Sequence, residues 1–159
     1  MNLNEELINQ FYTSFIKKDY VGMQACYADN IEFSDPAFPG LKGKQAKAMW
    51  HMLIISGKDM QLVFNNIKAN ENHGSADWIA TYTFSLTGRK VINHVHADFE
   101  FSNGKIVKHA DTFDFHKWAS QAFGLKGALL GWTPFFKNKI QGVTKERLQT
   151  FINKTPAYQ

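Results

Sequence analysis

The sequence contains very little that could cross-link the chain, hold a metal ion or anchor it in a membrane. Its 159 residues include a single cysteine, Cys26, so no disulfide bond can form within the chain. Cysteine and histidine nowhere occur together at the spacing of a zinc site. The first ten residues, MNLNEELINQ, carry acids where a signal peptide needs basic residues, and no long apolar run follows. We therefore expect a soluble, cytoplasmic protein without stable membrane association.

Composition and charge favour a small globular domain over a nucleic-acid-binding protein. The net charge is +4, but the basic residues are scattered, and even the densest region, 137–154, interleaves them with polar and apolar residues. Nucleic acid is therefore not an expected partner. The length suits one domain with a substantial core, and fourteen phenylalanines indicate either a large apolar core or an apolar pocket.

Hydrophobic periodicity predicts helices at both ends of the chain and a run of strands between them. Apolar residues recur at helical spacing from Leu3 to Ile16, with Asn4 as the expected cap. Helices first and an antiparallel meander afterwards indicate an α+β fold, with helices packed on one face of a curved sheet. The expected helices are 3–17, 20–28, 44–55, 117–123 and 136–153, and the expected strands are 31–34, 60–69, 76–86 and the two arms of a hairpin over 92–115.

The hairpin is the stretch in which chemistry is most strongly indicated. Asn103-Gly104 lies between two alternating runs, which is a strong signal for a two-residue turn. Regular pairing outward from this turn places Asp98 opposite His109 and His96 opposite Asp111, with all four side chains on one face. His94, Glu100, Val107 and Phe113 join that face. The alternatives are that this is simply the solvated face of the sheet, or that a bulge breaks the pairing.

Three stretches together resemble the nuclear-transport-factor-2-like superfamily, in its SnoaL-like and ketosteroid-isomerase-like branch. They are Ala25 to Pro36 (ACYADNIEFSDP), the Gly43 turn into the third helix, and Phe99 to Asp114 (FEFSNGKIVKHADTFD). The match covers about residues 3–123, so we expect a cone-fold domain over 1–123 with a helical extension over 124–159. The resemblance implies a cone-shaped, cystatin-like α+β barrel with a deep apolar pocket, frequent dimerisation, and chemistry that needs no cofactor or bound metal.

The resemblance also carries over candidate residues from two branches. Asp35, in Phe33-Ser34-Asp35-Pro36, occupies the place of the isomerase general base, although an Asp before Pro is also a common turn starter. The tyrosine donor of the isomerases falls at Phe11, with Tyr12 adjacent, and their aspartic acid donor falls near Ala97, beside Asp98. Asp111, in the pattern Gly104-Lys105-Ile106…His109-Ala110-Asp111, matches the acid/base residue of SnoaL-like cyclases.

Our leading hypothesis assigns acid/base chemistry to Asp111 with His96, supported by His109 and Asp98, and keeps Asp35 as an alternative base. For ligand binding we expect Tyr12, Trp50, Trp78, His94 and Phe113, although aromatic residues such as the first three are more often part of the core. His94, His96 and Asp111 could also be read as a metal set, which lacks a further convergent ligand.

The function expected from these residues is binding of a small lipophilic molecule by a homodimer, with isomerase, cyclase or dehydratase chemistry. A non-catalytic carrier and a protein-interaction module are the alternatives. The apolar segment 128–136 (ALLGWTPFF) could serve the latter, but packing against its own domain is the ordinary expectation.

Overall fold

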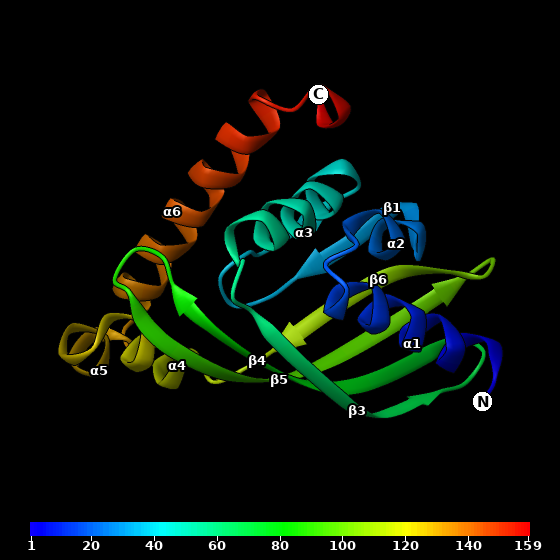
Figure 1. Ribbon diagram of the computed structural model, residues 1–159, viewed down its shortest axis with the longest axis horizontal. Helices are drawn as coiled ribbons and strands as arrows, with labels where there is room; N and C mark the ends of the chain where they lie inside the picture. The colour runs from blue at the N-terminus through cyan, green and yellow to red at the C-terminus, as the bar shows by residue number, and fades with distance from the viewer.

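The computed structural model describes all residues, 1–159, as a sheet curved around helices, with further helices at one end (Figure 1). The helices are α1 (Leu3–Ile16), α2 (Tyr20–Ala25), α3 (Lys44–Ser56), α4 (Phe115–Phe123), α5 (Leu125–Leu130) and α6 (Pro134–Asn153), followed by the 3-10 turn η1 (Pro156–Tyr158). The strands are β1 (Tyr27–Ser34), β2 (Leu41–Lys42), β3 (Gln61–Ala69), β4 (His73–Phe84), β5 (Arg89–Ser102) and β6 (Lys105–Thr112).

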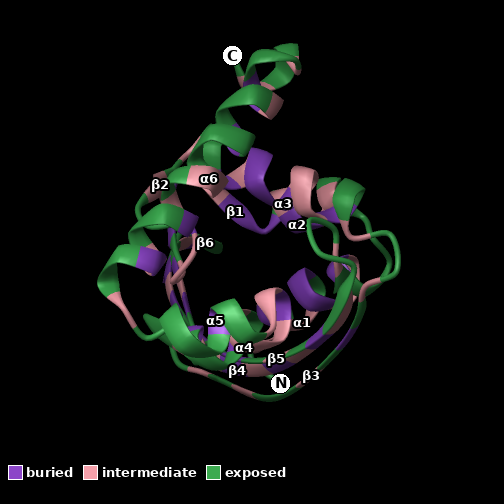
Figure 2. Ribbon diagram, turned by 90° about the vertical axis from the view of Figure 1, so that its left-hand side faces the viewer, coloured by how far each residue is buried: buried purple, intermediate pink, exposed green.

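All six strands form a single sheet in the order β2-β1-β6-β5-β4-β3. Every neighbouring pair is antiparallel except β1 and β6, which run parallel. Viewed from its end, the sheet bends around the helices without closing (Figure 2). The expected α+β cone with a mostly antiparallel sheet is therefore confirmed, and the predicted meander is β3 to β6.

Helix α1 lies inside the curve because one of its faces is apolar. Ile8, Phe11, Tyr12 and Phe15 are all buried on it. The predicted cap was wrong by half a turn: the cap is Asn2, which forms a capping box with Glu5, because a side-chain acceptor two residues further on would lie inside the helix.

Two apolar clusters form the core. The larger contains 26 buried residues and fills the space between α1, α3 and the inner face of the sheet. The smaller contains seven buried residues around Trp118 and joins α4 to α6. Burial of this much apolar surface is the main term that stabilises the fold.

The C-terminal helices are attached to the domain at defined points. Asp114 caps α4, and Thr133 caps α6 with Pro134 in the first turn. Near its middle, α6 is tied to the loop after β1. The Gln141 side chain donates to the carbonyl of Pro36 at 3.0 Å, and the Thr144 hydroxyl donates to that of Ala37 at 2.6 Å. The boundary proposed near residue 124 stays a prediction.

The apolar segment 128–136 does not pack against its own domain as expected. Phe136 is buried, but Leu129, Trp132 and Phe135 are 62%, 70% and 77% exposed. The reason is that α5 is only six residues long and turns one side to the body, which leaves its other side uncovered. None of the helices is both long enough and apolar enough to cross a membrane.

Candidate functional site

A bulge in β6 changes which side chains of the hairpin face the interior. Near the turn the expected register holds, with Ser102 opposite Lys105 and Phe101 opposite Ile106. Asn103 and Gly104 both have positive φ, as the predicted turn requires. The register then shifts, so that Glu100 lies opposite Lys108 instead of Val107.

The expected cross-strand pairs are therefore wrong. His109 lies opposite Phe99, Asp111 opposite Ala97, and His96 opposite Thr112. Because side chains alternate along a strand, one extra residue moves everything beyond it to the other face. His109 and Asp111 thus point inward and are buried, whereas His94, His96 and Asp98 stay on the exposed outer face. This also separates Asp111 from His94 and His96, so the three do not form the metal set considered from the sequence.

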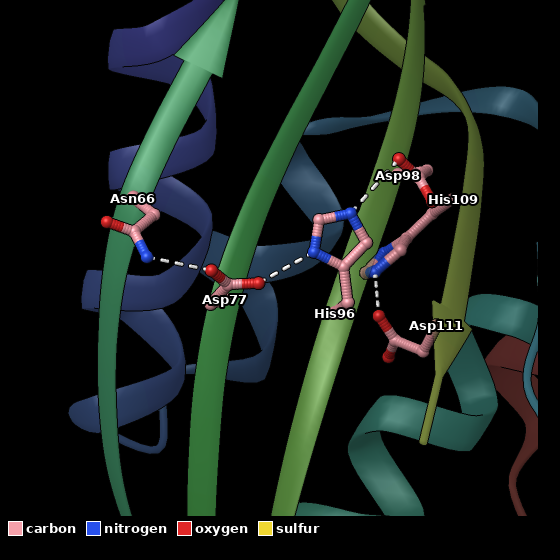
Figure 3. A network of polar contacts seen from close by, with 6 residues as sticks. All are labelled: Asn66, Asp77, His96, Asp98, His109 and Asp111. Atoms are coloured by element: carbon pink, nitrogen blue, oxygen red, sulfur yellow. Dashed lines mark hydrogen bonds and ion pairs between the residues drawn. The ribbon is translucent and has the colours of Figure 1, made fainter. Parts of the chain in front are cut away.

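The outer face carries a polar network that is separate from the interior one (Figure 3). His96 Nδ1 lies 2.6 Å from Asp77, and its Nε2 lies 3.4 Å from Asp98. Asn66 donates to the other oxygen of Asp77 at 2.8 Å. The hydrogen bond to Asp77 raises the pKa of His96, and the bonds from Asn66 and His96 lower the pKa of Asp77.

Inside the cone, a chain of hydrogen bonds leads to Asp111. The indole N–H of Trp50 donates to the Tyr27 hydroxyl at 2.8 Å, and that hydroxyl lies 2.7 Å from Nδ1 of His109. Nε2 of His109 lies 2.8 Å from Oδ1 of Asp111, and both side chains are almost fully buried, at 0% and 2% exposure (Figure 3).

The order of donors and acceptors in these hydrogen bonds determines which ring nitrogen of His109 carries the hydrogen. Since Tyr27 accepts from Trp50, its own O–H is left to donate to Nδ1 of His109. His109 is then the tautomer with its hydrogen on Nε2, which donates to Asp111. This arrangement holds one oxygen of Asp111 and leaves Oδ2 without a protein donor.

Asp35 is held by the backbone that follows it. Its Oδ1 accepts from the N–H groups of Ala37 at 2.7 Å and Phe38 at 2.6 Å, the turn geometry that Asp before Pro favours. Its Oδ2 has no protein donor. Burial, with a smaller contribution from the charge of Asp111, raises the pKa of Asp35 to about 7, and the two backbone hydrogen bonds partly oppose this rise.

Asp35 and Asp111 line the same cavity, which has a volume of about 190 Å³. Eighteen of the 27 residues that line it are hydrophobic. Its walls come from α1, the loop after β1, α3, β4, β5, β6, α4 and α6, so that helix α6 covers part of it. Of the expected ligand-binding residues, Trp50, Trp78 and Phe113 line the cavity, whereas Tyr12 lies in the core and His94 lies outside. Neither His96 nor Asp98 reaches the cavity.

The sequence analysis missed two further polar residues on the cavity wall, Tyr82 and Arg147. Tyr82 accepts from the Trp118 indole at 2.8 Å, and its own O–H has no acceptor in the protein. Burial raises the pKa of Tyr82, and the charge of Asp35 adds to that effect. Its place could have been found from alternation on β4, because Trp78, Ala80 and Tyr82 share one face.

Arg147, on α6, is the single cationic side chain on the wall of the cavity. It lies one turn beyond Val143 and Thr144, which also line the cavity. It forms no ion pair with a protein carboxylate. Nothing in the sequence singles out Arg147, because this residue lies outside the family motifs that identified Asp35 and Asp111.

Comparisons with known proteins agree with this architecture. An NTF2-like protein of unknown function from Burkholderia pseudomallei superposes with a TM-score of 0.67 at 17% identity, over 77% of this chain and 98% of that one. A candidate SnoaL-like polyketide cyclase from Jannaschia sp. CCS1 gives a TM-score of 0.67 at 11% identity, over 77% and 92%. TerC, crystallised with polyporic acid, gives 0.61 at 19% identity, over 74% and 98%.

At these identities, the superpositions establish the fold alone. A search of curated proteins found no match. The sequence model of the SnoaL-like domain matches residues 8–109, which is more than half of the chain and includes Asp35 and His109. The chain belongs to the SnoaL-like domain family.

Proposed function

We propose that this protein binds a small lipophilic carbonyl compound in the cavity and moves a proton next to its carbonyl group. The observation that carries this proposal is that two carboxyl groups, Asp35 and Asp111, line one largely apolar cavity. Each of them has one oxygen bonded to the protein and one oxygen without a protein donor. Paired carboxyl groups in different environments are a recurrent means of supplying both an acid and a base.

In the proposed reaction Asp111 is the base. Its free oxygen takes a proton from the carbon next to the carbonyl, so the C–H bond breaks, an O–H bond forms on Asp111, and the electron pair moves onto the carbonyl oxygen. His109 keeps the carboxylate oriented through its Nε2–H, whereas the sequence-based hypothesis took His96 as the acid/base partner of Asp111. The relay through Tyr27 and Trp50 holds His109 itself.

The developing oxyanion needs a hydrogen-bond donor, and the cavity offers two. Tyr82 has a free O–H, and Asp35, whose pKa of about 7 keeps it partly protonated near neutral pH, can donate from its free oxygen. Return of the proton to another carbon gives isomerisation, whereas attack of the enolate on a second carbonyl of the same molecule gives cyclisation. Both outcomes begin with the same proton abstraction.

That shared first step can be assayed before the natural substrate is identified. Lipophilic ketones that raise the melting temperature in a thermal-shift screen are incubated with the protein in D₂O, and exchange at the α-carbon is followed by NMR. We expect exchange that falls at least about 100-fold in Asp111→Asn, the usual scale for loss of a general base. His96→Gln, on the outer face, is the matched control and keeps full activity.

Exchange that is equally fast in Asp111→Asn would refute the assignment of the base. A non-catalytic carrier is the second candidate, because the apolar wall of the cavity supports ligand binding without any chemistry. It predicts ketones that bind wild type and Asp111→Asn alike and undergo no exchange with either protein. The two candidates therefore give different results in the same experiment.

A further inference from the structure

We propose that the corner formed by α5 and the start of α6 docks reversibly onto an anionic lipid surface. The first observation is a cluster of uncovered apolar side chains. Leu125, Leu129, Leu130, Trp132 and Phe135 are 76%, 62%, 41%, 70% and 77% exposed, all within eleven consecutive residues. Elsewhere exposed large hydrophobic residues are spread along the chain, as is normal for a soluble domain.

These residues lie at a spacing that brings their side chains together. Leu125 and Leu129 are one turn apart on α5. The Trp132 indole N–H donates to the carbonyl of Leu129 at 2.9 Å, which ties the ring to the end of α5 and satisfies its polar atom. Phe135 follows in the first turn of α6. In Figure 2, which faces this end of the molecule, α5 projects as exposed ribbon beside α4 and α6.

The chain segment that carries this cluster contains charged residues of one sign only. From residue 115 to residue 145 the chain contains no aspartate or glutamate, although it has 14 acids elsewhere. The same stretch contains five lysines, none of which forms an ion pair: Lys117, Lys126, Lys137, Lys139 and Lys145.

Two of these lysines lie beside the apolar residues. Lys126 is one turn from Leu129 and Leu130, and Lys139 is one turn from Phe135. Apolar residues flanked by lysines, with an interfacial tryptophan, match the chemistry of a membrane surface that carries anionic headgroups. A second copy of this chain is less well matched, because the same unpaired lysines would face one another across a symmetric contact.

The position of the corner is also suited to a lipophilic ligand. Phe123, two residues before Leu125, lines the cavity, and so does Ile140, one residue after Lys139. The surface patch is thus flanked in the sequence by two residues of the cavity wall. Docking does not depend on the proton transfer proposed above, since the patch contains neither carboxyl group.

The test is binding of the full-length protein to vesicles. We expect cosedimentation with vesicles of phosphatidylcholine containing about 30% phosphatidylglycerol, much weaker binding to phosphatidylcholine alone, and weakening as salt rises. Trp132 is a natural reporter, because Trp50, Trp78 and Trp118 are only 2%, 9% and 6% exposed. Its fluorescence should be quenched by lipids with brominated acyl chains.

Matched variants separate the contribution of the apolar residues to vesicle binding from that of the lysines. Trp132→Ser with Phe135→Ser, and separately Lys126→Glu with Lys139→Glu, should each weaken binding at least about tenfold. Val21→Ser with Val63→Ser, and separately Lys58→Glu with Lys68→Glu, change exposed apolar residues and exposed lysines elsewhere, and should leave binding unchanged. Unchanged melting curves would show that all four variants are folded.

Absence of binding to anionic vesicles at low salt would overturn the proposal, as would equal binding by the corner variants and the controls. A homodimer that is dissociated by Trp132→Ser with Phe135→Ser would instead assign this surface to a second copy of the chain.

Discussion

Replacing Asp35 with Asn should make the protein more stable at alkaline pH. The substitution is nearly isosteric, and Asn keeps the Oδ1 atom that accepts from Ala37 and Phe38. It removes only the ability to carry a negative charge in the cavity. Since burial is the main reason for the raised pKa of Asp35, the charge itself is what the fold disfavours.

The size and sign of the effect follow from the two pKa values. In the unfolded chain Asp35 releases its proton near the ordinary pKa of 3.8, whereas the native protein holds it up to a pKa of about 7. Between these values the native state binds the extra proton, so the free energy of unfolding falls as pH rises, by about 1.4 kcal/mol per pH unit. The difference between Asp35→Asn and wild type therefore grows from near zero below pH 4 to at most about 4 kcal/mol above pH 7.

The measurement is urea denaturation of both proteins across this pH range. A gain of 4 kcal/mol would correspond to roughly 8–16 °C in melting temperature for a domain of this size. Asp19→Asn is the control, because Asp19 is an exposed helix cap whose role Asn can keep. Parallel pH profiles for Asp35→Asn and wild type would refute the account, and the D₂O exchange assay would show whether the stabilised variant has lost activity.

Two further predictions concern the buried tyrosines and the outer histidine. Tyr12 has a buried hydroxyl without a protein partner, so Tyr12→Phe should leave the free energy of unfolding unchanged or raise it by about 1 kcal/mol. Tyr27→Phe removes the hydrogen-bond partner of both Trp50 and His109, and should lower the free energy of unfolding by about 2 kcal/mol. Denaturation curves showing the reverse order would contradict the hydrogen-bond assignment. The raised pKa of His96 stabilises the native state fully below its ordinary value of 6.5, and this contribution is lost as pH rises through the higher native value. His96→Gln should therefore flatten the pH profile of stability in that window, and an unaltered profile would show that the contact with Asp77 is not maintained in solution.

Features that depend on a few neighbouring residues could be predicted well from the sequence. Five of the six helices followed from apolar spacing, whereas α5 was not expected and the second helix was expected to reach residue 28, where β1 has already begun. Asn103-Gly104 specified its own turn, since both residues adopt positive φ. Errors of this local kind were small, as with Asn2 taking the place expected for Asn4.

The register of β6 could not be predicted in the same way. This strand pairs with β5 on one side and, in parallel, with β1 on the other. Its bulge falls where the β1 pairing is also irregular, between Tyr27 and Glu32. Alternation within the hairpin contains no information about a third strand, and for that reason His96 was placed opposite Asp111.

The sequence by itself predicted the fold class and the hairpin turn, and it named Asp35, Asp98 and Asp111 among its candidate residues, because each prediction rests on a short-range pattern or motif. Only the tertiary structure decided that Asp35 and Asp111 share one cavity, that His109 is the residue holding Asp111, and that α6 supplies Arg147 to the wall. These are contacts between segments far apart in the chain. They depend on strand register and on how the extension packs, and neither follows from local propensity.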